Sequence, residues 1–138
     1  MTVRSHTLPR PSRVQRRPDF ERAYDTGLRI HGRFMAIFVV ANGRLHARLG
    51  VAATKKLGSA VERNRVKRLS REVFRRHKLA AGIDIIVVPR REMLDAPFSS
   101  LEADYLALLA RRDRARPASE RERRPRSRGG RPRAASRV

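Results

Sequence analysis

The side chains best suited to chemistry in this sequence are cations gathered between residues 59 and 78. Arginine guanidinium and lysine ammonium groups bind phosphate oxygens, so the chemistry that they offer is recognition of a polyanion. On a helix with 3.6 residues per turn, Val66, Leu69 and Val73 share one face, nearly opposite a polar stripe. The stripe consists of Asn64, Lys67, Arg68, Arg71, Arg75 and Lys78, with Arg63 and Arg65 beside it. A helix here would present a ladder of phosphate-binding groups.

Acidic residues are scarce on this segment, which distinguishes it from an ordinary solvated helix face. Solvated faces mix charges, with glutamate placed before lysine at i, i+4. Here Ser59 and Glu62 have the spacing of a capping box, which uses that glutamate at the helix start, and Glu72 is the other acid. Like charges along one stripe favour an anionic partner, RNA or DNA. A membrane surface is disfavoured, because the chain has no tryptophan to anchor the helix there.

Catalysis by the protein itself has little support in the residue types. A nuclease needs clustered carboxylates for magnesium or paired histidines for proton transfer. The histidines, at positions 6, 31, 46 and 77, form no close pair, and Asp84, Glu92 and Asp95 have no evident convergent partners. The absence of cysteine excludes a thiolate zinc site and a catalytic cysteine. We therefore expect neither a catalytic residue nor a metal ligand in this chain.

Three helices and three or four strands must position these side chains. A first helix is predicted at 18–26, since Phe20 and Tyr24 are four residues apart and Gly27 follows. The other predicted elements are strands at 34–41, 49–54 and 83–88, a helix at 59–78, a helix from Ser99, with Glu102 as capping-box partner, to about 110, and a further short strand near 28–30. The order α-β-β-(β)-α-β-α predicts an α+β fold, a two-layer α-β sandwich with helices on one face of a small sheet.

The Asn42-Gly43 step predicts how two of the strands pair. Asn-Gly after a β-rich run is a strong hairpin signal. We therefore expect the strands at 34–41 and 49–54 to be antiparallel neighbours, with a loop that extends as far as His46.

Charge and composition divide the 138 residues into a body and two basic extensions. The formal net charge is +21, and 30 of the 34 basic residues are arginine, a bias that genome base composition can also produce. Residues 111–138 carry +9 with almost nothing apolar, so we predict a disordered Arg-rich tail, after a basic flexible arm at 1–16 and a domain at 17–110. No secretory signal or run of roughly 20 apolar residues is present, which predicts a cytoplasmic protein without a membrane partner.

Residues 55–72 resemble the signature of the bacterial ribonuclease P protein subunit. They read KKLGSAVERNRVKRLSRE: a Lys-Lys strand end, Gly and Ala-Val, an Arg-Asn-Arg helix start, then Lys-Arg and Arg-Glu. The resemblance extends over about residues 8–110, through the first helix, Arg48 and Gly50 in one strand, and the strand at 84–88. Tyr24 stands where the family commonly has Phe, and Thr54 where it commonly has Ser.

The resemblance implies a fold, an activity and partners. The implied fold is a small α-β sandwich related to the second domain of ribosomal protein S5. In this family the protein joins a catalytic RNA, and the ribonucleoprotein is an endoribonuclease that removes the 5′ leader from precursor tRNA. Metal-activated water in the RNA performs the chemistry, so the protein alone is expected to be inactive and magnesium is bound mainly by the RNA. The protein binds the leader and promotes magnesium and substrate binding, with no protein partner implied.

The resemblance also implies site residues. Those expected to contact the catalytic RNA, or to lie at its junction with substrate, are Arg63, Asn64, Arg65, Lys67, Arg68, Arg71 and Arg75. Those expected to line a cleft for the single-stranded leader are Phe20, Tyr24, Phe38, Thr54, Lys55 and Lys56. Aromatic faces stack on unpaired bases and lysines hold the backbone. Whether Phe20 and Phe38 face this cleft or the core stays open.

A ribosomal or architectural RNA-binding protein without a nuclease role fits the composition equally well. The feature that discriminates is the Arg-Asn-Arg helix placed after Lys-Lys-x-Gly.

Overall fold

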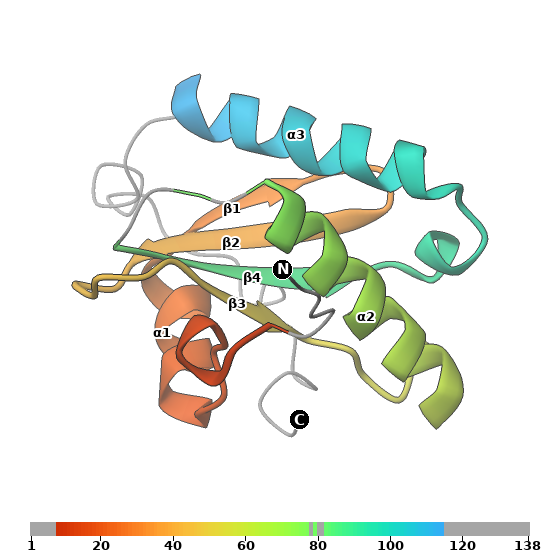
Figure 1. Ribbon diagram of the computed structural model, residues 1–138, viewed down its shortest axis with the longest axis horizontal. Helices are drawn as coiled ribbons and strands as arrows, with labels where there is room; N and C mark the ends of the chain where they lie inside the picture. Colours follow the sequence, from red (N-terminus) through yellow and green to blue (C-terminus); the bar gives the residue numbers. More distant parts are fainter. Residues whose placement is uncertain (1–7, 78, 80–81, 115–138) are drawn as a thin grey trace, which may run out of the picture.

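The computed structural model describes residues 8–77, 79 and 82–114, in which helices cover both faces of a four-stranded sheet (Figure 1). In chain order the elements are η1 (Arg10–Ser12), α1 (Arg17–Thr26), β1 (Leu28–His31), β2 (Met35–Ala41), β3 (Arg48–Val51), α2 (Ala60–Arg76), β4 (Ile83–Pro89), η2 (Arg91–Leu94) and α3 (Phe98–Arg114). The predicted α+β class is confirmed, and the further strand near 28–30 is β1. None of the helices in the described part of the chain combines the length and apolarity needed to span a bilayer.

The strands lie in the order β1-β2-β4-β3, so the predicted pairing of the second and third strands is wrong. β4 lies between them, antiparallel to β2 and parallel to β3. The successive apolar residues 85–87 of β4 are all buried, which favours a central position with both faces covered. The hairpin of this sheet joins β1 to β2 instead, and Gly32 N–H donates to the Met35 carbonyl in its turn.

Alternation along the strands separates two hydrophobic cores. Ile37 and Ile85 belong to the core under α2 and α3, whereas Phe38 and Ile86 belong to the core under α1. Because β2 and β4 carry large apolar side chains at consecutive positions, both faces of the sheet need a cover. The expectation that helices pack on one face is therefore wrong: α1 covers the face opposite α2 and α3 (Figure 1).

The ends of the domain extend beyond the predicted boundaries. Leu8 and Val14 are buried, and the Val14 N–H donates to the Leu49 carbonyl at 2.8 Å, so residues 8–16 are packed and not a flexible arm. α3 runs to Arg114, into the segment predicted to be disordered. Its start is one residue before the predicted cap Ser99, where the Pro97 carbonyl accepts from Leu101 N–H. The rest of the predicted arm and tail, residues 1–7 and 115–138, lies outside the described residues.

Candidate RNA interface

The start of α2 is fixed by the capping box that the sequence predicts. Ser59 Oγ accepts from Glu62 N–H at 3.1 Å, and the Glu62 carboxylate accepts from Ser59 N–H at 2.9 Å. This backbone hydrogen bond, helped by the Arg91 charge, lowers the pKa of Glu62. The buried face of α2 consists of Val66, Ser70, Val73 and Phe74, while Leu69 is half-buried. The orientation of the helix decides where its cations lie.

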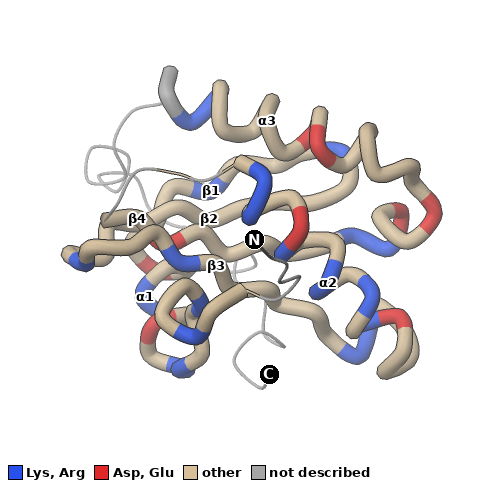
Figure 2. Tube along the Cα trace, viewed as in Figure 1, with Lys and Arg blue, Asp and Glu red and all other residues tan. Residues whose placement is uncertain are grey.

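The basic stripe of α2 divides into exposed, paired and inward-facing members. Asn64, Arg65 and Arg68 are exposed to solvent (basic positions along the chain are blue in Figure 2). Arg63 donates to the Gly58 carbonyl at 3.0 Å, and Arg75 donates to the carboxylate of Glu72 at 2.6 Å, so both guanidinium groups already have protein partners.

Lys67 and Arg71 are the inward-facing members, and they line a cavity of about 250 Å³ at the β3 edge. We call it the α2 cavity; it is lined by Arg13, Val14, Gln15, Phe20, Leu49, Gly50, Val51, Lys67 and Arg71. No acid is among these residues. Burial, and then the charges of Arg71 and Arg63, lower the pKa of Lys67. Burial and the charge of Arg13 likewise lower the pKa of Arg71. An anion that entered this cavity would offset both repulsions.

Gly50 allows an aromatic ring to reach the α2 cavity. A Cβ at this position would lie 2.8 Å from Ile86 Cδ1 and 3.0 Å from the Phe20 ring. Phe20 can therefore pack directly on β3 only because residue 50 has no side chain. The cavity thus combines three cations with part of an aromatic ring.

The three aromatic residues predicted to line one leader cleft are mainly core residues. Phe20, Tyr24 and Phe38 are 6%, 2% and 3% exposed. The Tyr24 and Phe38 ring centroids are 4.9 Å apart at 69°, and those of Phe20 and Tyr24 are 6.4 Å apart. The Tyr24 and Phe38 rings pack edge to face and the Phe20 and Tyr24 rings are tilted, while Phe20 and Phe38 each line a different cavity.

Phe38 lines a second cavity, of about 210 Å³, which we call the β1–β4 cavity; it is lined by Arg29, His31, Ala36, Phe38, Val88, Pro89 and Arg90. The Arg29 guanidinium carbon lies 5.9 Å from the centroid of the Phe38 ring. Arg90 donates to the Gly32 carbonyl at 3.2 Å and lies 3.4 Å from His31 Nδ1. Burial and three arginine charges lower the pKa of His31, which favours its neutral form. The β1–β4 cavity therefore combines the cations Arg29 and Arg90 with an apolar surface.

The family model described as Ribonuclease P matches residues 8–113. The ribonuclease P protein component of Desulfovibrio desulfuricans is 38% identical over 123 residues, which cover 85% of this chain and 95% of that protein. This chain belongs to the ribonuclease P protein family. It is the protein component of the endoribonuclease that processes precursor tRNA, and the RNA subunit of that ribonucleoprotein is its partner.

Solved structures of the family have the same fold. The RNase P protein from Thermotoga maritima matches with a TM-score of 0.65 at 32% identity, covering 72% of this chain and 96% of that one. The RNase P protein from Staphylococcus aureus matches with a TM-score of 0.65 at 33% identity, covering 72% and 93%. Family membership decides against the alternative of an RNA-binding protein without a nuclease role.

Thr54, Lys55 and Lys56 lie apart from both cavities. They occupy the turn between β3 and α2, where Leu57 N–H donates to the Thr54 carbonyl at 3.0 Å. Both lysines are exposed, and Thr54 is half-buried. They therefore extend the basic surface at the start of α2 and do not join Phe20 or Phe38 in a cavity described above.

Sequence reasoning missed the contribution of the N-terminal segment to this ribonuclease P protein. Arg13 and Gln15 line the α2 cavity, although both fall in the predicted flexible arm. The available signal was Leu8 and Val14, two apolar residues among the arginines, which are the residues that anchor the segment. Arg29 and Arg90 were also missed, because nothing in their spacing indicates that they line a cavity together with Phe38.

Metal ligands do not gather in the part of the protein that the structure describes. No group of three His, Cys, Asp or Glu side chains comes together there. Asp84, the most buried carboxylate, instead accepts from Arg48 at 2.8 and 2.6 Å and from Asn42 at 2.7 Å. These residues do not fit a bound magnesium ion.

Proposed function

We propose that this ribonuclease P protein divides its RNA contacts between two surfaces. The exposed part of the α2 stripe, Asn64, Arg65 and Arg68, binds the catalytic RNA. The α2 cavity and the β1–β4 cavity bind the single-stranded 5′ leader of precursor tRNA. The observation that carries the proposal is the convergence of Arg13, Lys67 and Arg71, with no acid among the lining residues, on a cavity that includes Phe20.

Both cavities offer what an unpaired strand requires. A phosphodiester backbone needs cations, and a base needs an apolar or aromatic surface that does not read sequence. In the β1–β4 cavity Ala36, Phe38 and Val88 supply the apolar surface, and Arg29 and Arg90 supply charge. Because the aromatic faces are largely buried, bases would contact ring edges, and charge would provide most of the binding free energy.

Hydrolysis of the phosphodiester bond belongs to the RNA in this proposal. Magnesium held by RNA phosphates would supply a metal-activated water there. The cations of the protein reduce repulsion between the phosphates of the leader and those of the catalytic RNA. The protein would act in the cytoplasm, as its family suggests.

The two surfaces can be tested separately in the reconstituted ribonucleoprotein. Arg29→Gln should lower the affinity for precursor tRNA several-fold more than the affinity for mature tRNA, without changing the affinity for the catalytic RNA. The double variant R65Q/R68Q should do the opposite. Arg33→Gln is the matched control, because Arg33 is exposed near β1 and lines neither cavity. Equal loss on precursor and mature tRNA with Arg29→Gln would reject the assignment of the β1–β4 cavity to the leader.

A further inference from the structure

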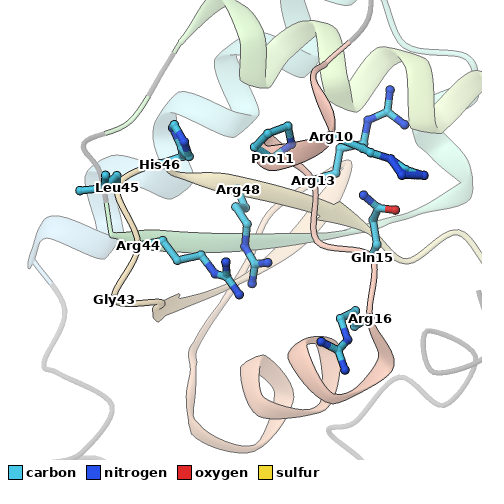
Figure 3. A pocket seen from close by; sticks show the side chains of 10 residues that line it. All are labelled: Arg10, Pro11, Arg13, Gln15, Arg16, Gly43, Arg44, Leu45, His46 and Arg48. Carbon is cyan, nitrogen blue, oxygen red and sulfur yellow. The ribbon is translucent and has the colours of Figure 1, made fainter.

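A third cavity, of about 600 Å³, lies between the N-terminal segment and the loop that joins β2 to β3 (Figure 3). It is lined by Arg10, Pro11, Arg13, Gln15, Arg16, Gly43, Arg44, Leu45, His46 and Arg48. Figure 3 shows residues 10–16 along one side and residues 43–46 along the other, with Arg48 between them. None of the residues predicted to bind RNA or leader lines this cavity.

The charge of this third cavity is strongly unbalanced. Five of its ten lining residues are arginine and none is acidic. The charge of Arg48 is offset by two carboxylates, since its guanidinium binds the Asp84 carboxylate at 2.6 Å and lies 3.4 Å from Asp19. The side chains of Arg10, Arg16 and Arg44 are exposed and form no ion pair with any other described residue. Three arginines that form no ion pair with another described residue therefore surround one open volume.

The third cavity adjoins the α2 cavity. Arg13 and Gln15 line both of them. Arg13 is held in place between the two, because its Nε donates to the Leu8 carbonyl at 2.7 Å and its neighbour Val14 is bonded to β3. Cations thus follow one another from Lys67 and Arg71 on α2, across the N-terminal segment, to Arg44 in the β2–β3 loop.

We propose that the third cavity is an additional binding site for the phosphodiester backbone of RNA. A strand that occupies the α2 cavity continues past Arg13 and between the N-terminal segment and the β2–β3 loop. Arg10, Arg16 and Arg44 bind successive phosphates there through their planar, two-pronged guanidinium groups. A single small anion would not use three arginines spread around 600 Å³. This inference rests on the proposed function of the α2 cavity, and its RNA is either the catalytic RNA or the precursor.

Salt dependence tests the site directly. Each phosphate contact that is lost reduces the magnitude of the negative slope of log affinity against log salt by about 0.7 to 0.9. The variant R10Q/R44Q should therefore reduce that magnitude by between about one and two in the holoenzyme. R17Q/R33Q is the control with equal charge loss, because both arginines are exposed and line none of the three cavities. An unchanged slope for R10Q/R44Q overturns the proposal, whatever the labelling experiment below shows.

Site-directed cleavage shows which RNA lies in the cavity. The chain contains no cysteine, so Leu45→Cys creates a single attachment point for an iron chelate, on a side chain that is 87% exposed. Ala107→Cys, exposed on α3, is the control. Cuts at discrete nucleotides of the catalytic RNA or of the precursor leader, absent with Ala107→Cys, support the site and identify the strand. Identical cleavage patterns from positions 45 and 107 would contradict it. If Arg29→Gln and R65Q/R68Q still behave as expected, the proposed function stands without this site.

Discussion

At the scale of single residues, the cations of α2 differ in what surrounds them, although their spacing places them in one stripe. Asn64, Arg65 and Arg68 are exposed, whereas Lys67 and Arg71 meet Arg13 in the α2 cavity. Helical periodicity predicts which residues share a stripe. It does not show that a distant arginine joins two of them, because that contact depends on how the N-terminal segment packs.

Lys67 should show a conflict between binding and stability. Because its pKa is lowered by burial and by Arg71 and Arg63, the folded state disfavours the charged lysine, and stability rises as pH rises through the lowered pKa. Lys67→Met should leave the free protein as stable or about 0.5 kcal/mol more stable, while lowering the salt slope of RNA binding by about one. Thermal unfolding and binding titrations at several salt concentrations measure both quantities. Loss of stability together with unchanged RNA binding would show that Lys67 is structural.

Phe20 tests how much of the leader contact comes from an aromatic edge. Phe20→Ala should destabilise the fold by about 3 to 4 kcal/mol, because the side chain is buried against Tyr24 and β3. Phe20→Leu should cost less than about 1.5 kcal/mol and is therefore the informative variant. We expect it to weaken the binding of precursor tRNA more than that of mature tRNA, measured on the folded holoenzyme. Equal effects on both would assign Phe20 to the core alone.

At the scale of elements, local signals predicted helices and strands well and predicted their neighbours poorly. The capping box at Ser59 is confirmed, because both of its partners lie within one turn. The repeat of that spacing at Ser99 is wrong, since the chain already becomes helical at Phe98 after Pro97. The Asn42-Gly43 turn exists, with Gly43 at φ 65°, but it leads the chain past β4. The order of the strands depends on which strand is apolar enough to occupy the centre of the sheet. A turn motif carries no information about that.

The start of α2 should be sensitive to acid. The pKa of Glu62 is lowered, so its cap stabilises the protein at neutral pH and is lost as pH falls through the folded-state value, below the ordinary value of 4.5. The difference in stability between the wild type and Glu62→Gln should therefore shrink between pH 7 and pH 3. Ser59→Ala should cost about 1 kcal/mol at neutral pH. Denaturant unfolding across this pH range measures both, and a difference that is independent of pH would contradict the role of the Glu62 charge.

At the scale of the whole molecule, one buried carboxylate connects three elements beside the proposed RNA-binding surfaces. Asp84 on β4 binds Arg48 on β3, and Arg22 on α1 lies 3.5 Å from the same carboxylate. Arg48 also reaches Asp19 on α1 at 3.4 Å. The sequence shows these charges far apart, in segments with no common periodicity. Their convergence follows from the parallel pairing of β3 and β4, which places Arg48 opposite Asp84.

This network should be costly to break from one side. Asp84→Asn or Arg48→Met should lower the free energy of unfolding by about 3 kcal/mol, because each removes the closest partner of a buried charge and leaves it only the weaker contact with Asp19 or Arg22. The double variant should cost clearly less than the two single variants together, since it leaves neither charge unpaired. Denaturant unfolding of the four proteins provides the cycle. Additive losses would show that Arg48 and Asp84 do not act as a pair.

Above all, we propose that this protein works by joining a catalytic RNA to the leader of its substrate. The most direct measurement is cleavage of precursor tRNA at low magnesium by the protein, by the catalytic RNA from the same source, and by both together. We predict cleavage of the 5′ leader only by the combination. We also expect the protein to raise the affinity of the catalytic RNA for precursor tRNA but not for mature tRNA, which has no leader. Cleavage by the protein alone, or failure of the protein to rescue the RNA, would contradict the account.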